Sequence, residues 1–520
     1  MKKSLIYNWW LSGQQQAYAD VVGVNTTGYG EQVFGILGDS NSDGSAASIQ
    51  TVSAGILFNW NGSSYDEITI QSVSNGSPTT GNVIHKFAID YNANTGKKIL
   101  CCNGGRGGSN LYPTGASDEH WMGASAPTGI DLWAPFVTKL NAALSNKSLT
   151  KPKAIFIVGL GVNDVGSGTS IANVSTALDA LITNITTTYP GVPILYSTTG
   201  VTNLTTNVIS DLCYGVRNLQ ILKSQSVTDL HIVGAGASCV GANFYEVDGI
   251  HYNLNGLNHL GSTYARWFKN LSLVSNKTAR SIISSHFDDL SLARKNVIQT
   301  AIENLGSDYN KLEAWNRFKT TTENNVYFDW TFLGNAGKVG SPTFLTNNYI
   351  QTSGLNIANR WNFVSWDGSA MRSATKTDFI EGVKLITNAD GGAGANQSLF
   401  GVNNSGVGGR YLEDGFNGTI RFTANDNTQT TGATAAKLED NTLHCIARSA
   451  GNKLFISDTT VRNTTAVTAV TTVGSRLCII GGRETTTPFD GTYEYSFKAK
   501  YSDFDLANFI AVNDYITDNW

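Results

Sequence analysis

Ser40 stands out as a candidate nucleophile because it lies in a turn of small residues, GDSNSDG, directly after an apolar run. A serine hydroxyl becomes an effective nucleophile when a nearby base removes its proton. Asp248 and His251, in DGIHYNLNG, have the matching types, because an imidazole can take the proton while a carboxylate holds its tautomer. Although a lone GDS turn or a lone histidine is more often structural, the three together predict a Ser40–His251–Asp248 triad.

A second group of residues has the types needed to stabilise an oxyanion. Asn163, in GLGVNDVG, carries an amide that can donate to a developing negative charge, and such a donor contributes roughly 3–4 kcal/mol when it is preorganised. The glycine-rich segment CCNGGRGGSN allows a backbone N–H to approach a ligand closely. We expect the backbone of Ser40 and of Gly108, or alternatively Gly107, to complete the hole, while Asp164 shapes its loop.

The elements that must position these residues form an α/β pattern between residues 31 and 273, in which short apolar runs alternate with helical periodicity. The expected strands are 33–37, 97–102, 153–160, 192–198 and 230–235, and the expected helices are 131–146, 170–186, 205–224 and 255–272. Such alternation predicts a parallel sheet covered on both faces, with ligands bound at the carboxyl ends of its strands. The stretch 46–95, with GILFNW, DEITIQ and HKFAIDY, is expected to be an inserted β-rich excursion.

The order of the motifs along the chain is as informative as the motifs themselves. Ser40, the glycine segment, Asn163 and the Asp248–His251 pair each follow an expected strand or precede the last helix. His259 is a competing base, but it lies inside that helix rather than at its start. Four motifs that all occur at such positions, and in this order, arise by chance far less often than a single motif does. We therefore expect them to meet at one edge of the sheet.

In this order the motifs resemble the four blocks of the SGNH (GDSL-type) hydrolase superfamily, over roughly residues 31–273. The resemblance identifies Ser40 as nucleophile, Gly108 and Asn163 as oxyanion donors, and Asp248 with His251 as the last block. It implies a three-layer, flavodoxin-like α/β fold that uses neither metal nor cofactor. Members of the superfamily cleave esters, often acetyl groups on carbohydrates, and also lipid or thioester substrates.

The remaining chain predicts a different architecture. Residues 1–30 form a lead-in, and 274–325 are expected to be a helical linker that includes LARKNVIQTAIENL and YNKLEAWNRF. From 326 to 520, short alternating segments separated by Gly and Asn turns predict an all-β sandwich with a short closing helix. NNYIQTSGLN, GNKLFISD and FDGTYEYSFKAKYSD resemble a laminin-G/concanavalin-A-like jelly roll, whose members commonly bind glycans.

Composition excludes some functional classes. A net charge of −4 with no basic patch argues against nucleic acid as a partner. No apolar run is long enough for a membrane span, and the run after Lys2 and Lys3 is too short for a signal peptide. The six cysteines show neither CxxC nor zinc-ligand spacing, so we expect mostly buried free thiols.

These observations predict a serine esterase, with O-deacetylation of an acylated polysaccharide or glycan as the leading activity. The absence of a signal peptide, the Gly/Asn/Thr-rich chain and the C-terminal jelly roll also fit a phage tail or fibre protein that associates with other virion proteins or with itself. Without a virion, we expect a cytoplasmic protein or export by a non-Sec route. The alternative is a glycan-binding adhesin or virion structural protein with a vestigial hydrolase domain. A lipase of the same superfamily ranks lower, because no long amphipathic lid helix lies beside the motifs.

Overall fold

The computed structural model describes the greater part of the chain. The described residues are 32–44, 49–70, 81–200, 210–234, 244–246, 248, 250–288, 290–318, 329–333, 336–339, 343–344, 350–352, 360–365, 378–388, 397–402, 409–415, 419–426, 430–434, 438–449, 451–466, 476–480 and 491–520. The expected lead-in at 1–30 lies outside the described residues. The chain divides into two compact units: an α/β unit of residues 1–199, 220–235 and 243–295, and a β unit of residues 200–219, 236–242 and 296–520.

The α/β unit is built on one mixed sheet. Among the described residues its strands lie in the order β3-β2-β4-β1-β7-β8-β9. Their bounds are β1 (Gln32–Gly38), β2 (Leu57–Trp60), β3 (Tyr65–Ile68), β4 (Ile99–Asn103), β7 (Ala154–Val158), β8 (Ile194–Ser197) and β9 (Leu230–Val233). The β2–β3 pair is antiparallel, and the other neighbouring strands are parallel. The five expected strands are thereby confirmed.

The order of the strands contains one reversal point. Apart from the β2–β3 hairpin at one edge, the five strands β4-β1-β7-β8-β9 lie in the spatial order 2-1-3-4-5 of their sequence. Among these five, the strand after β1 along the chain is therefore added on one side of it (β4), and the later strands are added on its other side (β7, β8 and β9). In doubly wound sheets the crevice at such a reversal, outside the carboxyl ends of the strands, is the usual binding position. In this sheet the reversal lies between β1 and β7.

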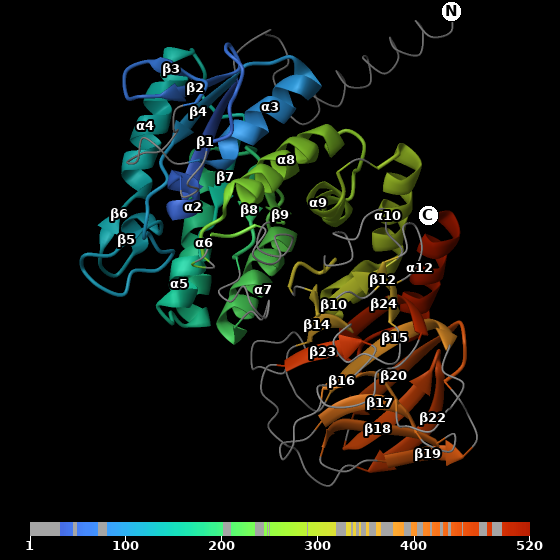
Figure 1. Cartoon of the computed structure of the whole chain (residues 1–520). Helices are drawn as coiled ribbons and strands as arrows, with labels where there is room; N and C mark the ends of the chain where they lie inside the picture. The colour runs from blue at the N-terminus through green and yellow to red at the C-terminus, as the bar shows by residue number, and fades with distance from the viewer. Residues whose placement is uncertain are drawn as a thin grey trace, which may run out of the picture. The chain divides into compact units, whose positions relative to one another are not determined.

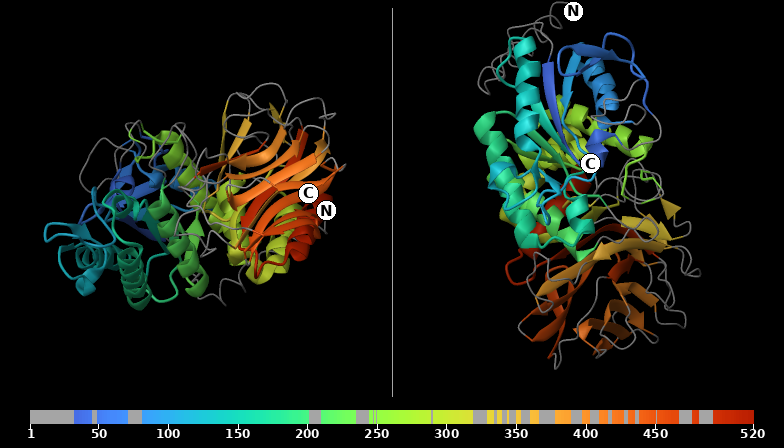
Figure 2. Two further views of the ribbon diagram at one scale, coloured as in Figure 1. Left: turned by 90° about the horizontal axis from the view of Figure 1, so that it is seen from below. Right: turned by 90° about the vertical axis from the view of Figure 1, so that its left-hand side faces the viewer.

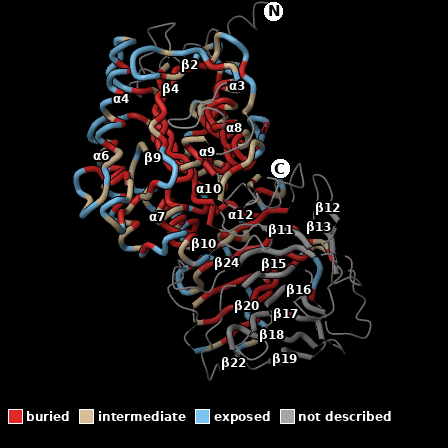
Figure 3. Tube along the Cα trace, turned by 60° about the vertical axis from the view of Figure 1, so that its left-hand side comes forward, coloured by how far each residue is buried: buried red, intermediate tan, exposed pale blue. Residues whose placement is uncertain are grey.

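Helices cover both faces of this sheet (Figure 1). The helices of this unit that follow its strands are α3 (Val83–Thr95), α4 (Trp133–Asn146), α6 (Ile171–Thr188), α8 (Leu254–Asn270) and α9 (Lys277–His286). Helix α7 (Asp211–Ser226) follows β8 along the chain and belongs to this unit from Gln220 on. Neighbouring residues of β1 show the alternation: the ring of Phe34 lies 5.0 Å from that of Phe87 on α3, whereas a Cβ at Gly35 would lie 3.1 Å from Leu140 on α4. The sheet is accordingly buried (Figure 3).

The segment 83–95 corrects the expected β-rich excursion. The β2–β3 hairpin is present, but HKFAIDY belongs to the helix α3. Asn82 caps the first turn by accepting from the N–H of Ile84, and Gly96 ends the helix in the left-handed conformation. The buried positions Ile84, Phe87, Ala88 and Tyr91 recur at helical spacing, which outweighs the β propensity of the aromatic and branched residues.

The β unit contains two antiparallel sheets (Figure 2). One has the order β12-β13-β24-β15-β20-β21-β22, and the other has the order β11-β14-β23-β16-β17-β18-β19. Their bounds are β11 (Ala336–Val339), β12 (Thr343–Phe344), β13 (Ile350–Thr352), β14 (Arg360–Ser365), β15 (Phe379–Asn388), β16 (Gln397–Val402), β17 (Gly409–Gly415), β18 (Thr419–Asp426), β19 (Thr430–Thr434), β20 (Thr442–Ser449), β21 (Asn452–Ser457), β22 (Thr460–Ala466), β23 (Arg476–Ile480) and β24 (Gly491–Ala499). The sheets meet where the ring of Phe422 lies 6.1 Å from that of Phe455.

The segment before these strands corrects a second expectation. Helix α10 (Leu292–Leu305) forms as expected, but LEAWNR is the strand β10 (Leu312–Arg317), which pairs antiparallel with β24. The helical periodicity read in YNKLEAWNRF is overridden by this long-range pairing. The expected closing helix is confirmed as α12 (Leu506–Asn519), where Phe509 packs 4.5 Å from the ring of Phe497.

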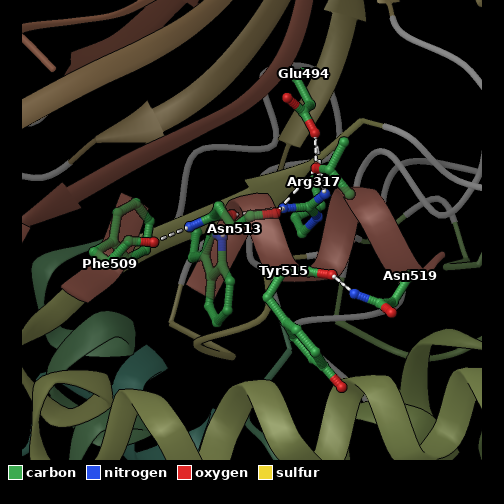
Figure 4. Close-up of polar contacts among 8 residues, drawn as sticks. Arg317, Glu494, Phe509, Asn513, Tyr515 and Asn519 are labelled. Carbon is green, nitrogen blue, oxygen red and sulfur yellow. Dashed lines mark hydrogen bonds and ion pairs between the residues drawn. The ribbon is translucent and has the colours of Figure 1, made fainter. Parts of the chain in front are cut away.

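A buried polar cluster joins β10, β24 and α12 (Figure 4). The Arg317 guanidinium donates to Asn513 Oδ1 at 2.6 Å and to Glu494 at 3.4 Å, and Arg317 and Glu494 are 2% and 3% exposed. Trp315 Nε1 donates to the same Asn513 oxygen at 3.1 Å. Thr517 donates to Glu494. A buried charge pair with its remaining groups hydrogen-bonded makes this cluster sensitive to the loss of either partner.

The thiols follow the expectation wherever their side chains are described. Cys101, Cys102, Cys213 and Cys445 are free and buried, and burial raises the pKa of Cys102 to about 12. The side chains of Cys239 and Cys478 lie outside the description. No helix among the described residues has the length and apolar character needed to cross a bilayer.

Candidate active site

Ser40 lies at the carboxyl end of β1, where the chain turns sharply into the short helix α2 (Ser40–Asp43). Gly38 has a φ of 144°, and a Cβ there would lie 2.0 Å from the carbonyl oxygen of Val158 on β7. Only glycine fits such a close approach. Asp39 then caps α2 by accepting from the N–H of Asn41 at 2.9 Å. The turn places Ser40 just beyond the carboxyl end of β1, whose neighbour in the sheet is β7.

The three residues expected to form a triad are hydrogen-bonded to one another. Ser40 Oγ lies 2.8 Å from His251 Nε2, and His251 Nδ1 lies 2.5 Å from Asp248 Oδ2. The side chains of His251 and Asp248 are 32% and 44% exposed, so an incoming molecule can reach the imidazole. His259 lies within α8 beside Phe244. The fold thus brings His251, rather than the competing histidine, to the serine.

Asp248 is held in the conformation that a partner of histidine needs. Its Oδ1 accepts the N–H of Ile250 at 2.9 Å and of His251 at 3.0 Å, which leaves Oδ2 for the imidazole. Partial burial raises the pKa of Asp248, but these backbone hydrogen bonds and the contact with His251 outweigh it and hold the pKa below its ordinary value. Asp248 is therefore ionised at neutral pH, and His251 Nδ1 carries the proton that it donates.

Asn163 lies one residue into the short helix α5 (Val162–Gly166), which follows β7. Its Nδ2 donates to the carbonyl of Ser109 at 2.9 Å. An amide nitrogen has two N–H groups, so this contact orients the side chain while using one of them. Asp164 accepts the N–H of Leu111 at 2.8 Å and of Tyr112 at 3.0 Å, so these side-chain bonds hold the distant segment after β4 rather than the loop of Asp164 itself. Burial raises the pKa of Asp164 to about 6.

The glycine segment after β4 lies beside the nucleophile. A Cβ placed on Gly107 would lie 3.9 Å from Ser40 Cβ, whereas Gly108 has a φ of 77° and nothing within 4 Å of a Cβ. Within the described part of the chain, no acceptor is recorded for the backbone N–H of Ser40, Gly107 or Gly108. Both glycines thus retain a free donor, and Gly107 is the one placed against Ser40. Arg106, next to them, pairs with Glu119 at 2.6 Å.

Asp39 is a buried carboxyl directly beneath the nucleophile. It is fully buried, and no partner is recorded for its Oδ2. Burial raises the pKa of Asp39 to about 7, against the lowering effect of the hydrogen bond from Asn41. A Cβ on Gly159 would lie 2.4 Å from Asp39 Oδ1. The absence of a side chain at Gly159 therefore makes room for this carboxyl at the end of β7.

Two contributors to the site are missing from the expectations. Ser109 orients the amide of Asn163 through its backbone carbonyl, and Asn41 bonds across to the loop of His251. The first is a main-chain contact without any side-chain signature. The second joins residues more than two hundred positions apart. No group of three or more His, Cys, Asp or Glu side chains in the described ranges is arranged to hold a metal ion.

No protein-family model matches the chain, and no curated protein matches it significantly. Among solved structures, a protein of Arabidopsis thaliana is similar at a TM-score of 0.34 and 15% identity, over 47% of this chain and 98% of its own. Trypanosoma rangeli sialidase in complex with sialic acid is similar at a TM-score of 0.30 and 11% identity, over 42% of this chain and 38% of its own. Domain 4 of an extracellular arabinanase from Geobacillus stearothermophilus is similar at a TM-score of 0.27 and 14% identity, over 40% of this chain and 98% of its own. Similarities at this level do not establish a shared fold.

Proposed function

We propose that this chain is a serine esterase that hydrolyses carboxylic esters through an acyl-enzyme. The observation that carries the proposal is the continuous chain of hydrogen bonds from Ser40 Oγ through His251 to Asp248. It provides a nucleophile, a base within reach of the nucleophile's proton, and a carboxylate that fixes the tautomer of the base. Its location at the reversal point of the sheet is the second support.

The reaction follows from the roles of these groups. Ser40 Oγ attacks the acyl carbon while its proton passes to His251 Nε2. The tetrahedral intermediate collapses as the bond to the alcohol breaks, and the alcohol leaves with that proton. A water molecule then attacks the acyl-serine, giving its proton to His251, and the carboxylic acid departs as Ser40 recovers its hydrogen. Asp248 stabilises the imidazolium that forms in each half of the reaction.

The oxyanion is stabilised by donors that surround Ser40. The second amide N–H of Asn163 and the backbone N–H of Ser40 are two of them, and a glycine of the 107–108 turn supplies the third. Gly108 fits the sequence motif, and the placement of Gly107 against Ser40 makes it the alternative. The Asn163 amide is already oriented by its contact with Ser109, and the other two donors belong to the backbone, so we expect little rearrangement at the moment of reaction.

Asn163→Ala is expected to lower kcat by on the order of 10²- to 10³-fold with little change in KM, because the lost donor acts mainly on the charge of the transition state. Steady-state kinetics with p-nitrophenyl acetate measures the change. Asn146→Ala, at an exposed position at the end of α4, is the matched control and should behave as wild type. A change confined to KM in the Asn163 variant would contradict the assignment.

We further propose that the α/β unit is an SGNH-type hydrolase domain with a flavodoxin-like fold. The order 2-1-3-4-5 is the flavodoxin-like order of a doubly wound sheet, and the four motifs lie at its carboxyl edge. For the β unit we propose a laminin-G/concanavalin-A-like jelly roll that binds a glycan. The resemblance of the motifs makes an acetylated carbohydrate the proposed substrate, and a phage virion is the proposed setting.

A series of p-nitrophenyl esters of increasing acyl length tests the activity and the acyl group together. We expect turnover of the acetate and a steady fall in kcat/KM with chain length, followed by release of acetate from an acetylated polysaccharide. A preference for long acyl chains would support the lipase alternative. If none of these esters is hydrolysed, the esterase proposal is wrong, and the result favours the alternative of a glycan-binding adhesin or virion structural protein.

A further inference from the structure

Asn41 links the nucleophile's helix to the loop that carries the base. It follows Ser40 directly and is 1% exposed. Its Oδ1 accepts the backbone N–H of Tyr252 at 2.9 Å, and its Nδ2 donates to the backbone carbonyl of Ile250 at 3.4 Å. These two backbone groups belong to the residues on either side of His251. One side chain therefore holds both neighbours of the base, with the Tyr252 bond as the stronger of the two.

The other backbone contacts of His251 lie within its own loop. Its carbonyl accepts the N–H of Glu246 at 2.8 Å, and its N–H donates to Asp248 at 3.0 Å. Such contacts give the loop its shape without setting its distance from Ser40. The bonds of Asn41 do set that distance, because Asn41 and Ser40 are consecutive residues of α2.

Asn41 is itself rigidly placed. Its backbone N–H donates to Asp39 Oδ1 at 2.9 Å, and a Cβ on Gly159 would lie 2.9 Å from Asn41 Cβ. The capping carboxyl below and the end of β7 beside it therefore leave little freedom. A buried side chain in this position cannot contact substrate, so any effect on the reaction must pass through other residues.

We propose that Asn41 is a positioning residue that holds His251 Nε2 within hydrogen-bond reach of Ser40 Oγ. This proposal rests on the esterase function proposed above. The loop of His251 and the turn of Ser40 are separate segments, and a shift of about 1 Å between reacting groups is enough to lower a rate on the order of 100-fold. Asn41 prevents that shift by tying the two segments together.

The test is a kinetic comparison of Asn41→Ala with wild type on p-nitrophenyl acetate. We expect kcat to fall on the order of 100-fold while KM stays the same, because substrate is not contacted. Asn41→Asp keeps the acceptor for the N–H of Tyr252 and is expected to recover part of the loss. Asn270→Ala is the control, since Asn270 is also buried in this unit but lies on α8 away from the triad.

A double-mutant cycle separates positioning from general damage. In a His251→Ala background the Asn41→Ala change is expected to have no further effect on the residual rate, because there is no imidazole left to place. A loss that persists in that background, a wild-type kcat, or a change in KM alone would each overturn the proposal. If Asn41→Ala fails to fold, the same cycle with Asn41→Asp decides. An inactive wild-type protein would instead remove the esterase function itself.

Discussion

Ser40→Ala is expected to reduce kcat for p-nitrophenyl acetate by on the order of 10⁴- to 10⁶-fold. The hydroxyl forms the bond to the acyl group, and no other serine is described within reach of His251. Binding and the oxyanion donors would remain, so a small residual rate above that of water is expected. KM should change little.

Asp248→Asn gives an independent reading of the same chain of hydrogen bonds. An amide can donate to His251 Nδ1 and favour the wrong tautomer, so we expect a fall in kcat on the order of 10⁴-fold. Because the three residues act as a unit, Ser40→Ala combined with Asp248→Asn should be no slower than Ser40→Ala alone. Multiplying effects would contradict a shared mechanism.

Covalent labelling with a fluorophosphonate probes the nucleophile directly. A fluorophosphonate is expected to label native protein at the peptide that contains Ser40, as located by mass spectrometry, and to leave the Ser40→Ala variant unlabelled. Ser145→Ala, at an exposed position on α4, serves as the matched control and should retain full turnover. Unchanged activity in Ser40→Ala would remove Ser40 from its proposed role.

Arg317→Met is expected to lower the free energy of unfolding of the β unit by about 3–5 kcal/mol. The substitution removes the guanidinium from a cluster in which Arg317 and Glu494 are 2% and 3% exposed. It leaves a buried carboxylate without its cation, and it removes one of the two donors to Asn513 Oδ1 while Trp315 Nε1 remains. The penalty comes mainly from the uncompensated charge rather than from the strength of the pair.

The double variant Arg317→Met/Glu494→Leu tests that reason. With both charges gone we expect it to be more stable than either single variant. Arg462→Met is the control, because Arg462 and Glu439 form an ion pair with side chains 46% and 56% exposed, and such pairs contribute about 1 kcal/mol or less. Chemical denaturation followed by tryptophan fluorescence measures wild type, the three single variants Arg317→Met, Glu494→Leu and Arg462→Met, and the double variant, with the two units fitted as separate transitions. Equal losses in Arg317→Met and Arg462→Met would refute the prediction.

The sequence by itself determined the elements that depend on near neighbours. Buried apolar runs of four to eight residues between turn residues predicted β1, β4, β7, β8 and β9, and helical spacing predicted α4, α6, α7 and α8. The residue types of Ser40, His251 and Asp248, together with their order relative to those strands, predicted the members of the site. Local pattern was sufficient because Ser40 closely follows β1, and Asp248 and His251 lie in the segment that leads into α8.

Local pattern failed where distant segments compete for the same residues. The aromatic and branched residues of HKFAIDY favour a strand, yet capping by Asn82 and burial on the sheet make them part of α3. LEAWNR has helical spacing, yet its pairing with β24 makes it β10. In both cases tertiary burial or pairing contributes more free energy than the local propensity does.

Only the tertiary structure decided how the members of the site meet. The 2.8 Å contact of Ser40 with His251 and the bonds of Asn41 to Tyr252 and Ile250 join segments more than two hundred residues apart. They exist because the sheet order places β1 beside β7 and returns the chain to that edge before α8. Spacing along a sequence does not encode such an order. Hydrogen bonds that depend on it can be identified only once the strands are assembled.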